Sequence, residues 1–292
     1  NEVMDLLESV EAEIKDRSNK IAVRLEIEPT ATKKTISLLT RQLGVEERFV
    51  YEIAGPINIC DFLPLYDHPV DACHKDIPFN PRISSRFTSD KDIFSIIREG
   101  DILLHHPYDS FTAVMDFLNA AADDPDVLAI KQTLYRTGKD SPVVAALRRA
   151  AENGKQVTAV VELKARFDEG HNIDWARKME ETGVNSVFGF VQWKTHCKAT
   201  LVVRREGNQL RRYVHLSTGN YNATTAKLYT DIGLFTCDSD FGSDVSALFN
   251  VLTGFNSWVS GDMLDEETVA AMFHHIRISP INVCWTLIGE IL

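Results

Sequence analysis

His196 and Lys198 are the residues best suited to do chemistry, and they stand in a His-x-Lys pair. On a strand that begins at His196, side-chain alternation places both residues on one face and Cys197 on the other. An imidazole beside a fixed cation is a poor proton acceptor but a reasonable nucleophile toward phosphorus, because the ammonium offsets the charge of the phosphoryl group. The later turn Ser217–Asn222 is rich in small residues and suits an oxyanion through its amides and carboxamides, among them Asn220.

Further cations stand where predicted strands end. Three successive apolar segments, 127–134, 157–163 and 186–191, are predicted as strands. Each runs into basic residues, which are Arg136 after the first, Lys164 and Arg166 after the second, and Lys194 after the third. In the sheets of α/β proteins, ligands bind at the carboxyl ends of the strands, and the planar guanidinium group of arginine matches the geometry of phosphate oxygens. Basic residues at three consecutive strand ends therefore favour an anion site over three unrelated surface charges.

The charge distribution along the chain supports this interpretation. The net charge of −11 by itself argues against a polyanion partner. Residues 131–230, however, contain 17 Lys and Arg against 9 Asp and Glu, a net of +8. The other 192 residues contain 14 against 33, a net of −19. The basic block 131–230 contains every cation singled out above and marks where an anion would bind.

Other candidate residues have competing interpretations. His105 and His106 either line a site at the entrance of a helix or pack in a turn. We interpret Asp168–His171 as a helix cap rather than a metal site, and Cys197 as a small buried side chain rather than a nucleophile. His274 and His275 are expected at the surface.

Composition and missing motifs exclude several classes of protein. A 292-residue chain with 44% hydrophobic and 25% charged residues is a folded protein, not a disordered one. Its five scattered cysteines form no CxxC pair, which indicates a reducing, cytoplasmic compartment and gives no zinc-site spacing. No apolar run approaches the ~18 residues of a membrane span. The usual nucleotide-binding loops, Walker, kinase glycine-rich and GxGxxG, are absent from the sequence.

The elements that must position these residues alternate between strand and helix from about Ser84 onward. Predicted strands cover 127–134, 157–163, 186–191, 196–203, 210–216 and 232–237, and predicted helices cover 109–122, 142–153, 173–182 and 244–252. This succession predicts an α/β fold with a mixed sheet flanked by helices on both faces. Earlier in the chain we expect a strand over 21–27, a helix that is capped by Thr30, runs through Leu43 and is stopped by Gly44, and a proline-rich linker over 56–81.

The sequence resembles bacterial polyphosphate kinases of the type that synthesises long chains, whose catalytic core is phospholipase D-like. The resembling blocks cover most of residues 100–255. They are Asp101–Phe111, Ile130–Arg136, Val161–Glu169, Lys194–Lys198, Ser217–Asn222 and Leu228–Gly233. The resemblance implies that 1–82 is the end of an α+β head domain with its linker, 83–262 the first phospholipase D-like catalytic domain, and 263–292 the start of a second.

The same resemblance implies roles for individual residues. The family's phosphohistidine intermediate falls on His196, and a nucleotide-contacting tyrosine falls on Tyr229. Its paired arginines, which stand beside magnesium and phosphate, fall on Arg136 and Arg166. An always-protonated guanidinium cannot ligate Mg²⁺. Both arginines are therefore expected to grip phosphate oxygens, with Mg²⁺ carried by the bound ATP.

The expected reaction is reversible transfer of the ATP γ-phosphate to inorganic polyphosphate through phosphorylated His196. Lys198 assists at the histidine, and Lys164 and Asn220 join the phosphate-binding groups. Phosphoryl transfer through a loose transition state relies on positioning and charge stabilisation, which suits a site without a carboxylate base. The resemblance further implies ATP, ADP and polyphosphate as ligands, no nucleic acid, a homo-oligomer, and a cytoplasmic enzyme with peripheral association to the inner membrane.

Two other functions stay open on the residues alone. A phospholipase D-like phosphodiesterase or nuclease also uses His-x-Lys and Gly-x-x-Asn, although Val203 replaces the Asp that the superfamily has five residues after the lysine. A non-catalytic module that binds polyanions needs only the basic strand ends. Because the partner half-site is expected in the second catalytic domain, we expect the 292-residue chain to fold but to be weakly active alone.

Overall fold

The computed structural model describes residues 12, 16, 21–66, 75–77, 79–87, 91–135, 141–163, 169–189, 194–254 and 272–279, with the side chains of 169–174 left out. The chain divides into two compact units, residues 12–79 and a larger unit that contains residues 80–292. Within the described residues, no helix combines the length and the apolar character needed to cross a membrane.

The smaller unit contains a short parallel pair of strands, β1 (Leu25–Ile27) and β2 (Val50–Glu52), and the helix α2 (Lys33–Leu43). The helix begins two residues later than predicted, because the Thr32 hydroxyl rather than Thr30 accepts the hydrogen bond from Thr35 N, at 3.1 Å. It ends where predicted, at Gly44, which adopts a left-handed φ of 66°. Two 3₁₀ segments, η2 (Glu47–Phe49) and η3 (Ile59–Tyr66), follow.

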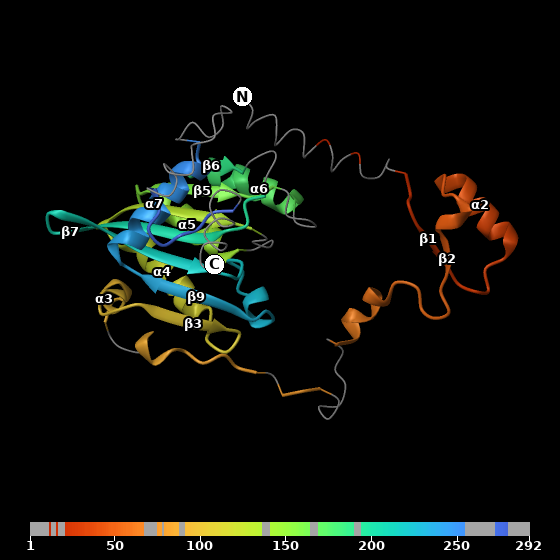
Figure 1. Ribbon diagram of the computed structural model, residues 1–292, viewed down its shortest axis with the longest axis horizontal. Coiled ribbons are helices and arrows are strands. Elements are labelled where there is room, and N and C mark those ends of the chain that lie inside the picture. Colours follow the sequence, from red (N-terminus) through yellow and green to blue (C-terminus); the bar gives the residue numbers. More distant parts are fainter. Residues whose placement is uncertain are drawn as a thin grey trace, which may run out of the picture. The chain divides into compact units, whose positions relative to one another are not determined.

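The larger unit is built on one seven-stranded mixed sheet (Figure 1). Its strands are β3 (Ile102–His106), β4 (Val127–Leu134), β5 (Gln156–Val161), β6 (Asn185–Phe188), β7 (Lys198–Glu206), β8 (Gln209–Ser217) and β9 (Asp231–Thr236). The order across the sheet is β3-β9-β8-β7-β4-β5-β6. β4, β5 and β6 are parallel, and every other neighbouring pair is antiparallel.

Helices cover both faces of this sheet. They are α3 (Ile93–Arg98), α4 (Thr112–Asp123), α5 (Pro142–Glu152), α6 (Glu169–Glu180) and α7 (Ser239–Leu252), and a 3₁₀ turn, η5 (Ser85–Phe87), precedes them. On one face, Phe249 of α7 belongs to a core cluster with Ala199 and Val214 of the central strands. On the other, Phe117 of α4 meets Phe235 of β9 with ring centroids 5.4 Å apart. The predicted mixed sheet flanked by helices is confirmed.

Most predicted elements of this unit form with small shifts of their ends. β4 has the predicted bounds, and the β7–β8 hairpin turns at Gly207, whose φ is 61°. α3 and β3 were not predicted, because a six-residue helix and a five-residue edge strand contain little periodic signal. The predicted strand 186–191 ends at Phe188, and the predicted helix 173–182 begins at Glu169. Of residues 263–292, only 272–279 are described.

Candidate functional site

The sheet topology brings the predicted site segments to one edge. β4 and β5 are parallel and end together at Leu134 and Val161. β7 is antiparallel to β4 and therefore begins at this edge. Lys198, its first residue, pairs with Ser217 at the end of β8, and Ser217 pairs with Gly233 near the start of β9. The ends of β4, β5 and β8 and the starts of β7 and β9 therefore lie along one line.

His196 lies in the segment 194–197, which precedes β7. The prediction that β7 begins at His196 is wrong, and so is the argument from alternation that placed His196 and Lys198 on one face of a strand. The physical reason is that Thr195 N donates to the side chain of Glu162 instead of to a ladder partner. The two residues are nevertheless in contact, because the Lys198 ammonium donates to the His196 carbonyl oxygen. The His196 side chain is exposed.

Tyr135 is the common neighbour of the groups around His196. Its ring meets the His196 imidazole edge to face, with centroids 5.3 Å apart. The ammonium nitrogens of Lys194 and Lys198 each lie 5.2 Å from its centroid, and aromatic faces attract cations at such distances. Tyr135 was not among the site residues predicted from the sequence. The missing signal was the antiparallel pairing of β4 with β7, which sets the end of one strand beside the start of the other.

Lys198 is 5% exposed. Burial lowers the pKa of its ammonium to about 8; the nearby Lys194 acts in the same direction, whereas the Asp231 carboxylate opposes it. A buried ammonium that has lost much of its hydration gains from an incoming anion. Burial also raises the pKa of the Cys197 thiol to about 11, which keeps it protonated and disfavours a role as nucleophile. The side chain is partly buried against the core cluster beneath α7.

The turn after β8 is tied to the start of β9. Thr218 Oγ1 donates to Asp231 Oδ1 at 2.8 Å and accepts from Ile232 N at 3.0 Å. Gly219 lies so close to Asp231 that a Cβ there would be 2.5 Å from Oδ2. The side-chain oxygen of Asn220 is buried and has no hydrogen-bond partner among the described residues. The turn therefore has a fixed shape and one polar atom that a ligand or water can satisfy.

Tyr229 also lies at this edge, two residues before β9 begins. Its backbone N–H donates to Thr225 O at 3.0 Å, directly after the 3₁₀ turn η6 (Thr225–Lys227), which Leu228 N closes on the same oxygen. Its side chain is 59% exposed, which suits contact with a planar base. Arg136, Lys164 and Arg166 lie outside the described residues, so their approach to His196 stays a prediction.

Two histidines are buried beneath the same edge. His106 Nδ1 lies 2.7 Å from the carbonyl oxygen of Asp109, which favours the packed turn among the two interpretations of His105 and His106. His215 Nδ1 lies 2.9 Å from the Tyr221 hydroxyl. Burial, with His106 nearby, lowers the pKa of His215 to about 3 and keeps it neutral.

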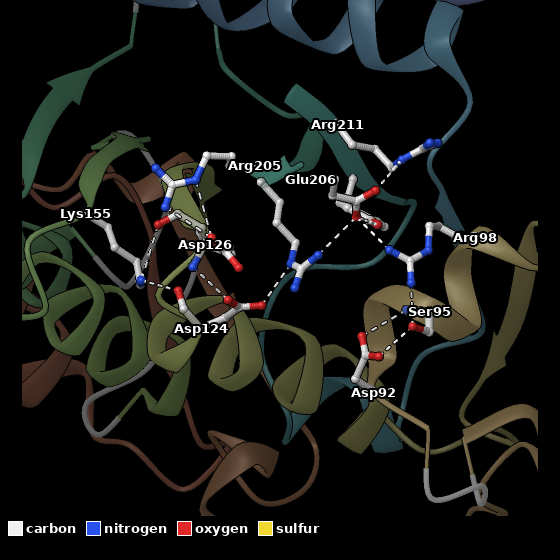
Figure 2. A network of polar contacts seen from close by, with 12 residues as sticks. Asp92, Ser95, Arg98, Asp124, Asp126, Lys155, Arg205, Glu206 and Arg211 are labelled. Carbon is white, nitrogen blue, oxygen red and sulfur yellow. Dashed lines mark hydrogen bonds and ion pairs between the residues drawn. The ribbon is translucent and has the colours of Figure 1, made fainter. Parts of the chain in front are cut away.

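At the opposite edge of the sheet, ion pairs neutralise part of the positive charge of the basic block 131–230 (Figure 2). Arg204 Nε lies 2.9 Å from Asp124 Oδ2, and an Arg205 nitrogen lies 3.1 Å from Asp126 Oδ1. Both acids come from outside residues 131–230. The net charge of +8 counted along the sequence therefore overstates the cations available to an anion. Among the described residues, Lys194 and Lys198 are the cations that share the Tyr135 ring with His196.

A metal cluster is absent from the neighbourhood of His196 as far as the structure describes it. The one described group with suitable spacing is Asp238, Asp240 and His275, exposed near the start of α7. His274 and His275 are about half exposed, and their backbone N–H groups donate to the buried Asp244 carboxylate.

Comparison with known proteins decides the family. Residues 92–257 match the family model "Polyphosphate kinase C-terminal domain 1", and residues 1–65 match "Polyphosphate kinase middle domain". The chain belongs to the polyphosphate kinase family. A polyphosphate kinase of Mycobacterium avium is 52% identical over 260 residues, which are 88% of this chain and 36% of that relative. Polyphosphate kinase 1 of Chlorobaculum tepidum is 46% identical over 282 residues, 97% of this chain and 38% of the relative.

A solved structure shares the fold. The crystal structure of polyphosphate kinase from Porphyromonas gingivalis superposes with a TM-score of 0.75 at 27% identity, covering 92% of this chain and 39% of that one. The chain thus spans between about a third and two fifths of the polyphosphate kinases it matches. Most of the middle-domain match falls in the smaller unit, and the C-terminal-domain match covers the seven-stranded sheet and the segment that contains His196.

Proposed function

We propose that this chain carries the phosphoryl-accepting site of a polyphosphate kinase, which transfers the γ-phosphate of ATP reversibly to inorganic polyphosphate through phosphorylated His196. The observation that supports this most strongly is the meeting of an exposed imidazole with two ammonium groups around Tyr135. A nucleophile and fixed positive charge are what transfer to a histidine requires. Because the chain covers only part of its relatives, the activity is proposed for the full-length enzyme.

The transfer proceeds in two steps. A nitrogen of the neutral imidazole attacks the γ-phosphorus, a phosphorus–nitrogen bond forms, and the bond to the bridging oxygen breaks to release ADP. A terminal oxygen of polyphosphate then attacks the same phosphorus, and the phosphorus–nitrogen bond breaks to restore His196 and lengthen the polymer by one phosphate. Each step moves negative charge among oxygens, which Lys198 and Lys194 stabilise from fixed positions. No proton has to be removed from the attacking groups, and the site needs no carboxylate base.

Magnesium fits this site as a companion of ATP. Two lysine ammonium groups lie around Tyr135, which also contacts His196, and an ammonium binds phosphate oxygens but cannot ligate a cation. The nearby carboxylates of Glu162 and Asp231 already accept hydrogen bonds from Thr195 and Thr218. Mg²⁺ neutralises phosphate charge when it is bound. Lys198, together with Arg136 and Arg166, would hold the phosphate oxygens of that complex.

Labelling with γ-³²P-ATP tests the proposal in the full-length enzyme. We expect the wild type to acquire acid-labile label and His196→Ala to acquire none. His275→Ala is the matched control, since it removes a half-exposed histidine near the start of α7, and it should label like the wild type. Acid-labile label that persists in His196→Ala would contradict the assignment. Hydrolysis of a phosphodiester without labelling from ATP would favour the phosphodiesterase function instead.

A further inference from the structure

Glu162 connects the end of β5 to the segment that contains His196. Its Oε2 atom accepts a hydrogen bond from the backbone N–H of Thr195 at 2.6 Å. Both residues are buried, with Glu162 3% and Thr195 7% exposed. A buried N–H group without an acceptor is costly. The bond therefore fixes the chain one residue before His196, at the point where the segment fails to join the sheet.

Glu162 is itself held on the sheet edge. Its backbone N–H donates to Leu134 O at 3.1 Å, so it is joined to the end of β4. On its other side, Gly189 N donates to Val161 O at 3.3 Å. A Cβ on Gly189 would lie 2.6 Å from Thr195 Oγ1 and 3.5 Å from Glu162 Oε2. The carboxylate and the Thr195 side chain are thus packed directly against the Gly189 backbone.

The peptide that carries His196 is held from two further sides. Lys198 donates to the His196 carbonyl oxygen, and Tyr135 packs edge to face on the imidazole. The backbone N–H before His196 is thus bound by Glu162, directly after β5, and the His196 carbonyl by Lys198 of β7. The imidazole ring packs on Tyr135, directly after β4. Of these contacts, the one to Glu162 involves a side chain that has no other place in the proposed reaction.

We propose that Glu162 is a positioning residue, whose bond to Thr195 N sets the place of the His196 imidazole for attack on phosphorus. The inference rests on the proposed function, because it assigns a role relative to phosphorylated His196. Misplacing a nucleophile by about 1 Å costs on the order of 100-fold in rate. What the role requires is an acceptor oxygen at this point, so glutamine should replace glutamate.

The test compares Glu162→Ala with Glu162→Gln in the full-length enzyme by single-turnover labelling from γ-³²P-ATP. We expect Glu162→Ala to slow labelling about 10- to 100-fold, because it removes the acceptor. Glu162→Gln should remain within about threefold of the wild-type rate. The labelled fraction at long times should be the same in all three proteins, since the nucleophile is intact. The apparent dissociation constant for ATP should change less than about threefold, which separates positioning from binding.

Two further variants make the result decisive. Glu152→Ala removes an exposed glutamate at the end of α5 and should label like the wild type. Gly189→Ala would push against the Thr195 side chain and keep the Glu162 carboxylate, so it should slow labelling as Glu162→Ala does. If thermal unfolding shows that Glu162→Ala does not fold, the labelling rate of Gly189→Ala takes its place as the test of positioning. The inference is overturned if Glu162→Ala labels at the wild-type rate, or if Glu162→Gln is as slow as Glu162→Ala. A wild type without any label overturns the proposed function itself.

Discussion

The ammonium of Lys198 is buried against the ring of Tyr135, with its nitrogen 5.2 Å from the ring centroid and a hydrogen bond to the carbonyl oxygen of His196. The positive charge of Lys198 is thereby held beside the exposed His196 imidazole, although burying an ammonium costs free energy. Its pKa of about 8 expresses this cost. The pH dependence of phosphoryl transfer should therefore report on Lys198.

We expect the rate of labelling to fall as the pH rises through about 8, because Lys198 loses its proton and its charge there. Lys198→Arg keeps a cation at every accessible pH, so the decline near pH 8 should disappear or move upward. Lys198→Met should be slow at all pH values. The measurement is the single-turnover labelling rate between pH 6 and 9.5 in the full-length enzyme. An unchanged alkaline decline in Lys198→Arg would assign it to another group.

His215 should make the protein sensitive to acid. Its folded-state pKa of about 3 is below the ordinary value of 6.5, so the unfolded chain binds a proton that the folded chain rejects. The free energy of unfolding should therefore fall as the pH falls below about 6.5, by about 2 kcal/mol between pH 7 and 5. Urea unfolding at the two pH values measures this fall. In His215→Gln the fall should be smaller by that amount, and an equal fall in both proteins would refute the prediction.

Asp244 should anchor the segment 272–279 to α7. Its fully buried carboxylate accepts hydrogen bonds from the backbone N–H groups of His274, His275 and Ile276. Burial opposes its charge, but these bonds together hold its pKa below the usual range. Asp244→Ala should lower the free energy of unfolding by about 2–4 kcal/mol, because several N–H groups lose a charged acceptor. Asp240→Ala, an exposed neighbour on the same helix, is the control and should change stability little; equal effects of the two would contradict the anchor.

Gly219 should tolerate no side chain. A Cβ there would lie 2.5 Å from Asp231 Oδ2 and 2.9 Å from Asp231 Cβ, so the turn or β9 has to move. We expect Gly219→Ala to slow labelling about tenfold or more, since the turn that carries Asn220 is displaced. Gly207→Ala, in the hairpin at the opposite edge, should lower the free energy of unfolding because alanine is strained at a φ of 61°, but it should retain the labelling rate. A wild-type rate in Gly219→Ala would show that the turn has no part in the reaction.

The sequence was sufficient for the parts of the fold that local patterns encode. The apolar strand β4 and the Gly44 stop were predicted at the observed residues. The start of β7 was not, because Thr195 bonds to a glutamate 33 positions earlier, a contact between distant residues that no local pattern carries. Tyr135 and Glu162 were missed as site residues for the same reason. The positive charge of the basic block 131–230 was overestimated, because Asp124 and Asp126, which precede the block in sequence, form ion pairs with Arg204 and Arg205 only in the folded sheet.

Mapping the phosphoryl group directly is the sharpest test of the central claim. The full-length enzyme is incubated briefly with ATP, digested under alkaline conditions that preserve phosphohistidine, and analysed by mass spectrometry. We predict that the phosphoryl group is found on His196, and that adding polyphosphate removes it as the polymer lengthens. A phosphoryl group on a different residue, or polyphosphate synthesis with His196 never modified, would contradict the account.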